Sequence, residues 1–170
     1  MRLVCGLGNP GLDYAKTRHN VGFMAADDLV RRFSFSAGKE KFKSVYHEGK
    51  IDGVKTIIIK PQTFMNLSGV SVRAFSEFYK IPAENILILQ DELDLPFGTV
   101  RLKHGGGLAG HNGLKSIEAH LGTNAFARIR IGIDKSDVLG KFSKEQLLTL
   151  EETLLPEVSQ KVETWMKEII

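Results

Sequence analysis

Short apolar runs of strand length, separated by segments with helical periodicity, constrain the fold of this chain more than any other feature. Residues 57–59 and 86–89 are continuous apolar runs, as expected for strands buried on both faces. Residues 20–33 instead repeat apolar side chains at the spacing of a helix. This alternation predicts an α/β fold: a single domain over residues 1–170, with a mixed, mostly parallel twisted sheet and helices on both faces.

The other elements follow from the same patterns and from local signals at their ends. Strands are predicted over residues 2–7, 43–49, 54–60, 86–90, 99–103 and 128–133, and helices over about residues 68–79 and 114–121. Asp52-Gly53 is a residue pair typical of a tight β-hairpin turn. Ser143 and Gln146 match a capping box that opens one or two C-terminal helices, with an interruption near Pro156.

The helix that ends near Tyr79 has two candidate N-terminal caps, Asn66 and Ser68. Both side-chain types can accept hydrogen bonds from the backbone N–H groups at the start of a helix. The expected buried stripe of this helix consists of Val70, Ala74, Phe75 and Phe78.

Composition excludes several classes of protein. Cys5 is the only cysteine, so an internal disulfide and a cysteine metal cage are impossible, and we expect a small core residue in the first strand. No apolar run approaches the ~20 residues that span a bilayer, and the chain opens on a strand pattern, which together predict a cytoplasmic protein. The formal net charge of +3 permits nucleic-acid binding without requiring it.

Polar residues stand at or near the ends of apolar runs that are far apart in the chain: Asn9, His19, Asn66, Asp91 and Asn112. Loops at the carboxyl ends of buried strands are where an α/β sheet collects its chemistry. We therefore expect these residues to converge on one cleft.

Among these residues, His19 is the candidate base, because an imidazole can take and return a proton near neutral pH. Its plainer interpretation is a cap or a solvated loop residue. Asp91 can orient an imidazole and stabilise its cationic form, although Asp94 competes for that role. Asparagine amides offer donors and an acceptor without charge, but they also cap helices well. His111 is either a second partner of the site or an ordinary loop residue.

Three other chemistries are disfavoured. Residues 6–11 match G-x-G-x-x-G, but the helical pattern starts only near Asn20, whereas a dinucleotide-binding helix opens within that motif. Ser68 lacks the first glycine of a G-x-S-x-G elbow. His19, Asp91 and His111 could form a metal site, but their spacing matches no metal-ligand signature. We expect no metal and no cofactor, and direct attack by water is the simpler hypothesis.

Five segments share an order and composition with one known family: residues 4–11, 18–22, 60–69, 91–96 and 105–113. Together they resemble bacterial peptidyl-tRNA hydrolase over most of the chain. The resemblance implies a monomeric hydrolase that acts in translation and ribosome rescue. Such an enzyme cleaves the ester between a peptide and the 3′-terminal ribose of its substrate, peptidyl-tRNA.

The resemblance also assigns roles to individual residues. It implies catalytic roles for His19, Asp91 and Asn9, and substrate binding by Tyr14, Met65, Asn66 and Asn112. Lys103 and Arg130 match the positions that bind tRNA phosphates, and Arg101 and Arg128 lie near them as basic strand ends suited to the same contacts.

Two alternatives remain open, and the chain departs from the family pattern in places. One alternative is a non-catalytic RNA-binding protein on the same fold, as in the plant chloroplast intron-splicing relatives; the other is a generic esterase. Leu108-Ala109 replaces a more usual histidine and glycine. The segment between Ile133 and Val138 is shorter than in many members of the family, and the chain ends soon after Trp165. These departures concern loop mobility and some substrate contacts rather than the central chemistry.

Overall fold

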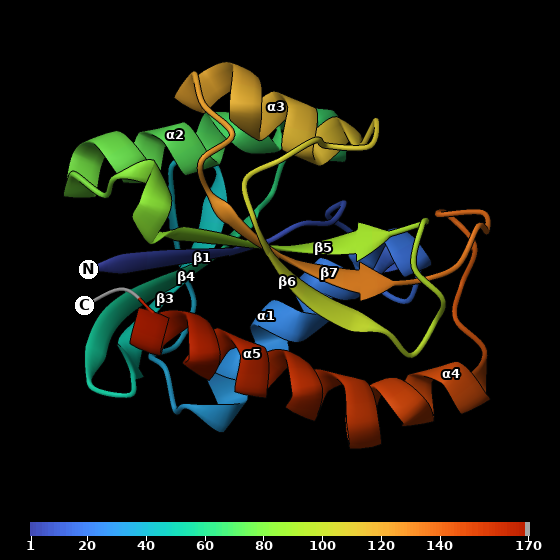
Figure 1. Ribbon diagram of the computed structural model, residues 1–170. Coiled ribbons are helices and arrows are strands. Elements are labelled where there is room, and N and C mark those ends of the chain that lie inside the picture. Colours follow the sequence, from blue (N-terminus) through green and yellow to red (C-terminus); the bar gives the residue numbers. More distant parts are fainter. Residues whose placement is uncertain (169–170) are drawn as a thin grey trace.

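A mixed sheet forms the centre of the computed structural model, which describes residues 1–168 (Figure 1). Its seven strands follow the order β2-β3-β4-β1-β5-β7-β6. Four of them are parallel neighbours: β4 (Val54–Pro61), β1 (Arg2–Gly6), β5 (Ile86–Glu92) and β7 (Ala127–Gly132). The strands towards the edges are antiparallel to their neighbours: β2 (Lys39–Lys41), β3 (Ser44–Ile51) and β6 (Val100–His104). The predicted mixed, mostly parallel sheet is confirmed.

Helices cover both faces of the sheet, as predicted (Figure 1). On one face lie α1 (Val21–Arg32), α4 (Lys144–Thr149) and α5 (Leu155–Glu168), and on the other lie α2 (Ser68–Tyr79) and α3 (Asn112–Leu121). Short 3-10 turns are η1 (Leu12–Tyr14), η2 (Arg18–Asn20), η3 (Met65–Leu67) and η4 (Ala83–Asn85). Each face buries its own apolar cluster, with Trp165 in one and Phe75 in the other. Cys5 is buried in β1, as expected.

The turn at Asp52-Gly53 joins β3 to β4 as predicted. Both residues have positive φ angles, 50° and 79°, which is the conformation that a two-residue hairpin of matching twist requires. Within residues 1–168, no helix is long and apolar enough to cross a membrane.

The expected cap of α2 is wrong, and the expected stripe is right for Phe75 but wrong for Phe78. Neither Asn66 nor Ser68 caps the helix: the Ser68 hydroxyl donates to the Met65 carbonyl, and the Gly69 N–H donates to the Ser116 hydroxyl of α3 at 2.9 Å. Phe78 is 59 % exposed, while Val72 and Phe75 face inward. The face that meets α3 is made of small residues, because a Cβ at Gly69 would lie only 2.2 Å from the Ser116 carbonyl oxygen. The buried face of α2 therefore combines Val72 and Phe75 with the close approach of Gly69 to α3.

The capping box at Ser143 is present, with both of its hydrogen bonds. The interruption of the C-terminal helix lies before Pro156, at a π-helical turn over Leu150–Leu154. A wider turn accommodates a proline ring that a regular helix would exclude. The short edge strand β2 was not predicted, since its three residues, Lys39–Lys41, have no apolar pattern.

Candidate active site

His19 lies in η2, directly before α1, and a segment from the far end of the chain holds its backbone. The His19 N–H donates to the Val138 carbonyl at 2.8 Å, and the Arg18 N–H donates to the Gly140 carbonyl at 3.0 Å. Asp91 lies near the carboxyl end of the central strand β5 and is only 3 % exposed. The backbone is therefore held in place by hydrogen bonds at both His19 and Asp91.

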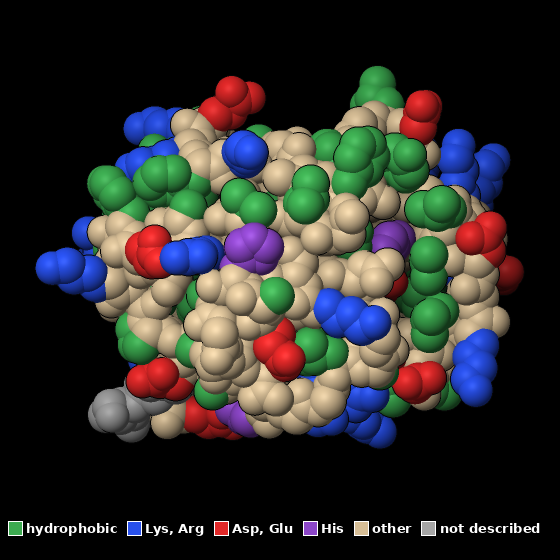
Figure 2. Space-filling view, turned by 90° about the horizontal axis from the view of Figure 1, so that it is seen from above, with side chains coloured by type: hydrophobic (Ala, Val, Ile, Leu, Met, Phe, Trp, Pro, Cys, Tyr) green, Lys and Arg blue, Asp and Glu red, His purple; other side chains and the backbone are tan. Residues whose placement is uncertain are grey.

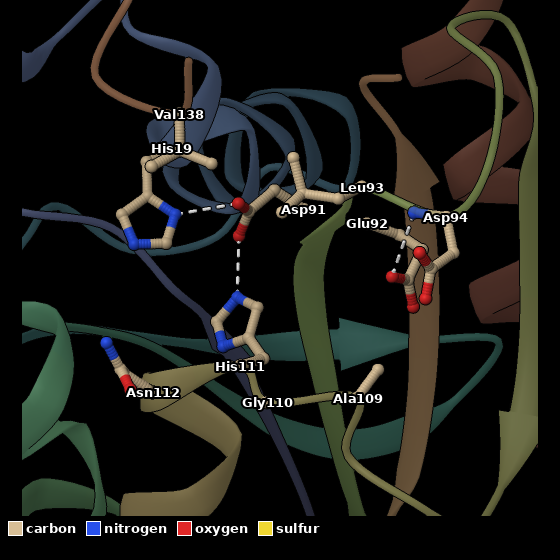
Figure 3. A pocket seen from close by; sticks show the side chains of 10 residues that line it. All are labelled: His19, Asp91, Glu92, Leu93, Asp94, Ala109, Gly110, His111, Asn112 and Val138. Carbon is tan, nitrogen blue, oxygen red and sulfur yellow. Dashed lines mark hydrogen bonds and ion pairs between the residues drawn. The ribbon is translucent and has the colours of Figure 1, made fainter. Parts of the chain in front are cut away.

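The His19 and Asp91 side chains form a direct pair, with 2.7 Å between Nδ1 of His19 and Oδ2 of Asp91 (Figure 3). An ionised carboxylate can only accept hydrogen bonds, so Nδ1 of His19 must hold the proton. The lone pair is then on Nε2, which has no hydrogen-bond partner among residues 1–168. His19 thus presents an unprotonated nitrogen that is open to a proton from outside.

His111 provides a second imidazole on the same carboxylate, with 2.7 Å between its Nε2 and Oδ1 of Asp91 (Figure 3). Its Nδ1 accepts from the backbone N–H groups of Gly113 and Leu114 at 3.1 and 3.3 Å, so His111 is the N-terminal cap of α3. These partners fix the proton on Nε2. The sequence left His111 open, although its place directly before a helix could have indicated the cap. Asp94, the competing acid, is exposed and contacts neither imidazole.

A pocket of about 200 Å³ opens beside this triad and brings together some of the predicted residues (Figure 3). Its lining includes His19, Asp91, His111, Asn112 and Val138. Asn112 is the first residue of α3 and is exposed. The expected convergence is therefore confirmed for His19, Asp91 and Asn112.

Asn9 lines a neighbouring hollow of about 220 Å³ rather than this pocket. Its Oδ1 accepts from the Met65 N–H at 2.8 Å. Its backbone N–H donates to Oδ1 of Asn20 at 2.8 Å, and its carbonyl accepts from Nδ2 of Asn20 at 2.9 Å. Asn20, which the sequence pattern did not single out, thus ties the Asn9 loop to the turn of His19. In the sequence, only the position of Asn20 next to the candidate base His19 could have indicated this role.

The remaining substrate-binding candidates line neither of the two hollows. Tyr14 is half-buried, and its ring meets Phe64 edge to face at 6.2 Å between centroids. Met65 is 4 % exposed and packs at the start of α3, where a Cβ at Gly113 would lie 2.7 Å from its Sδ. Asn66 is exposed. The single cleft that we expected is divided into a pocket and a neighbouring hollow, and Tyr14, Met65 and Asn66 line neither.

The sequence and the structure are both similar to those of one known family. The family model described as peptidyl-tRNA hydrolase matches residues 3–170. The chain belongs to the peptidyl-tRNA hydrolase family. A peptidyl-tRNA hydrolase of Bacillus cytotoxicus is 44 % identical, over 98 % of this chain and 93 % of the relative. One from Bacillus cereus strain Q1 is 48 % identical, over 86 % and 83 %. The crystal structure of the Acinetobacter baumannii peptidyl-tRNA hydrolase is 40 % identical, with a TM-score of 0.90 over 99 % of this chain and 89 % of that one.

In this peptidyl-tRNA hydrolase family member, cationic side chains gather on one face of the β6–β7 pair. The antiparallel register places Lys103 opposite Arg128 and Arg101 opposite Arg130. Nε of Arg130 donates to Oε1 of the buried Glu92 at 2.9 Å. Lys103 and Arg130 lie outside the pocket. Arg128 is only 1 % exposed, so its interpretation as a basic strand end suited to phosphate contacts is wrong.

The departure of this family member at Leu108-Ala109 has a visible structural effect. Ala109 has a φ angle of 50°, in the left-handed region that favours glycine, which costs about 1 kcal/mol for a residue with a Cβ. Leu108 is partly buried and packs against the apolar cluster under α2 and α3. The loop before His111 is therefore anchored at this point.

Exposed apolar groups flank the cations on the α2–α3 side of the molecule. Figure 2 shows groups of hydrophobic side chains on this face, with Lys and Arg side chains gathered mostly towards its two ends. Phe64 and Leu67, directly before α2, are 56 % and 49 % exposed. The face thus offers apolar contacts, with cationic contacts mostly at its ends.

The residues that could hold a metal ion are the same triad, because candidate ligand atoms of His19, Asp91 and His111 all lie within 4.8 Å of one another. In the structure, each imidazole uses the nitrogen facing Asp91 as a hydrogen-bond donor, and His111 Nδ1 is occupied by the start of α3. Chelation between the rings would require both N–H groups to lose their protons. The donor set fits a hydrogen-bonded triad better than an ion.

Burial alone would raise the pKa of Asp91, but the hydrogen bonds and charges of His111 and His19 outweigh it and lower the pKa to about 2. The ordinary value for the carboxyl is 3.8. A carboxyl with a lower pKa in the folded state stabilises the fold above its unfolded pKa. That contribution is lost as the pH falls through its folded pKa. Asp91 thus remains an anion between two imidazoles throughout the neutral range.

We expect Asp91→Asn to change stability in a pH-dependent way. An amide cannot accept from both imidazoles, so one buried N–H loses its partner. The shift from 3.8 to about 2 corresponds to about 2 kcal/mol of stability, present above about pH 4 and lost by about pH 2. Urea unfolding across this range should show the gap between the wild type and Asp91→Asn shrinking towards acid. Asp94→Asn removes an exposed carboxylate, and its free energy of unfolding should follow the same pH dependence as that of the wild type. A difference in unfolding free energy between Asp91→Asn and the wild type that stays constant with pH would refute this linkage.

Proposed function

We propose that this chain hydrolyses the ester between a peptide and the 3′-terminal ribose of tRNA, releasing free tRNA and the peptide. The observation that carries the proposal is the His19–Asp91 pair, whose unprotonated Nε2 is open beside a pocket. Membership of the peptidyl-tRNA hydrolase family supports the substrate class.

In the proposed reaction, Nε2 of His19 takes a proton from a water molecule while the water oxygen bonds to the ester carbonyl carbon. The resulting imidazolium faces the Asp91 carboxylate, which stabilises its positive charge. The imidazolium then returns the proton to the ribose oxygen as the ester C–O bond breaks. The products are a free ribose hydroxyl and a peptide carboxyl group, and no metal or other cofactor takes part.

His111 keeps Asp91 in place during this proton cycle. It donates to one carboxylate oxygen, so the other oxygen remains aimed at His19. Asn9 acts through Asn20 on the turn that contains His19. Its own Nδ2 group, which has no partner within residues 1–168, can donate to the substrate.

The other predicted residues would bind the substrate around this centre. Asn112 lies in the pocket and offers amide hydrogen bonds to the peptide or the terminal nucleotide. Asn66, Tyr14 and Met65 would contact the substrate at the rim. Lys103 and Arg130 would bind tRNA phosphates, which supply position and affinity rather than bond cleavage. We also propose that the protein acts as a monomeric single domain over residues 1–170 in the cytoplasm, in ribosome rescue.

The direct test is hydrolysis of an N-acetyl-aminoacyl-tRNA by the purified protein. Release of the acetyl-amino acid and of deacylated tRNA is the expected result. Binding of the tRNA without cleavage would support the non-catalytic RNA-binding alternative and would overturn the proposed reaction.

We expect Lys103→Ala to raise KM for full-length tRNA substrates and to leave kcat nearly unchanged. Loss of one phosphate contact should reduce the slope of log affinity against log salt by about 1. Lys55→Ala removes the same charge from an exposed site on β4, which β1, β5 and β7 separate from β6 in the sheet, and should have no effect. An equal loss on a short 3′-end mimic would contradict the assignment. Arg130→Ala is a less clean test, because it leaves the buried Glu92 unpaired.

A further inference from the structure

Arg128 is a buried cation that the proposed reaction does not use. It stands in β7, is 1 % exposed, and has no carboxylate within ion-pair distance among residues 1–168. Among the same residues, its Nε has no hydrogen-bond partner. Burial and the Arg130 cation lower the pKa of Arg128 and the Glu92 carboxylate raises it, but neither side chain is in direct contact with it, so the buried charge is costly unless its other groups are well bonded.

The groups that bond the guanidinium are carbonyls of the glycine-rich segment 105–107. One terminal nitrogen donates to the Gly105 and Gly107 carbonyls at 3.2 and 2.8 Å. Bonds from a charged donor are stronger than neutral ones and are favoured further by burial. At the intervening Gly106 the φ angle is 86°, and a Cβ would lie 2.9 Å from Cε of Lys103. A segment that is intrinsically flexible is therefore fixed to the sheet by one side chain.

Gln90 connects the same guanidinium to the catalytic strand. The other terminal nitrogen of Arg128 donates to Oε1 of Gln90 at 3.2 Å, and Nε2 of Gln90 donates to the Asp91 carbonyl at 2.7 Å. The glycine-rich segment leads within a few residues to His111, which donates back to the Asp91 carboxylate at 2.7 Å. The contacts form a closed circuit that begins and ends at Asp91.

We propose that Arg128, braced by Gln90, is a positioning residue that holds the glycine-rich segment so that His111 and Asn112 are set correctly against Asp91. The expected effect of Arg128 on turnover rests on the proposed function. Its structural part, the restraint of residues 105–113, holds for the protein without substrate. Because Arg128 is buried and bonded to carbonyls, it acts on the site from beneath the loop, whereas Lys103 and Arg130 act on tRNA from the surface.

The structural part is tested by amide hydrogen exchange in the substrate-free protein. Arg128→Met should accelerate amide exchange in residues 105–113 by about 10-fold or more relative to the wild type. Local opening of this segment in the wild type must break the charged hydrogen bonds of Arg128, and in the variant these bonds are absent, so opening costs less free energy. Arg73→Met is the matched control, since Arg73 is exposed on α2 and, within residues 1–168, pairs only with Glu77 four residues away. Unchanged exchange in a folded Arg128→Met protein would overturn the inference, whether or not the enzyme proves to be a hydrolase.

The functional part is tested by kinetics on N-acetyl-aminoacyl-tRNA. Arg128→Met should lower kcat by about 10-fold or more and leave the salt dependence of binding unchanged, whereas loss of a phosphate contact would flatten it. Arg128→Lys keeps the charge but cannot bridge two carbonyls and Gln90, so it should recover only part of the rate. Gln90→Leu should act in the same direction more weakly, and it serves as the test if Arg128→Met does not fold. Full activity of Arg128→Met or Gln90→Leu, or a flattened salt dependence, would refute the positioning role.

Discussion

His19→Ala should lower kcat for N-acetyl-aminoacyl-tRNA by about 10²-fold or more, because a positioned general base contributes on this scale. In the structure, Nε2 of His19 is the unprotonated nitrogen beside the pocket, and Asp91 already accepts from both imidazoles. No neighbouring group has the geometry to replace it, since His111 Nδ1 is occupied by the first N–H groups of α3. KM should change by less than a few fold, since the phosphate contacts that we propose are made by Lys103 and Arg130.

The control for this variant is His47→Ala. His47 lies in β3, far from the pocket, where its Nδ1 bonds the Ser36 carbonyl, so its removal should leave kcat unchanged. Thermal unfolding of both proteins separates a chemical defect from a folding defect. Near-normal turnover by a folded His19→Ala protein would eliminate the proposed mechanism.

An unblocked aminoacyl-tRNA should be cleaved slower by several orders of magnitude than the same tRNA bearing an N-acetylated amino acid. The blocked substrate presents a neutral amide, with a donor and an acceptor that the Asn112 side chain in the pocket can match. A cationic amine lacks the acceptor and leaves a polar partner unpaired, a mismatch that sites of this kind discriminate strongly against.

The acidic residues around the pocket do not offer the amine a compensating partner. Asp91 already accepts from His19 and His111, and Glu92 is paired with Arg130. Asp94 is exposed, so water screens its charge. The two substrates should be measured side by side with one enzyme preparation, and Asn112→Ala should narrow the ratio between them. Comparable cleavage of both substrates by the wild type would indicate a generic esterase.

The fold was predictable where local patterns and burial agree. The β3–β4 hairpin needed only Asp52-Gly53 between two apolar runs, and β5 was indicated by an uninterrupted apolar segment. The orientation of α2 was not predictable, because it depends on how closely Gly69 approaches Ser116, a contact between helices that are distant in the chain. Local periodicity therefore placed Phe78 in the core, and the structure places it at the surface.

The candidate site shows the same limit. Residue type and position made His19 and Asp91 candidates but left Asp94 as a competitor; the family resemblance favoured Asp91, and the structure places Asp91 in contact with His19. The circuit through Arg128 was not expected, since a basic residue on a strand normally points to solvent. Only the tertiary structure shows that its guanidinium lies beneath three glycines. Buried polar networks of this kind have no short-range signature.

The turn that contains His19 is held by residues that are synthesised more than a hundred positions later. Its backbone bonds to Val138 and Gly140, and these residues follow β7, the strand that lies between β5 and β6. Contacts of such high sequence separation form late in folding, because a long loop must close first. A folding chain can thus assemble β1, β4 and β5 before it has a competent base. The turn that presents Nε2 of His19 is therefore complete only when the segment after β7 is in place.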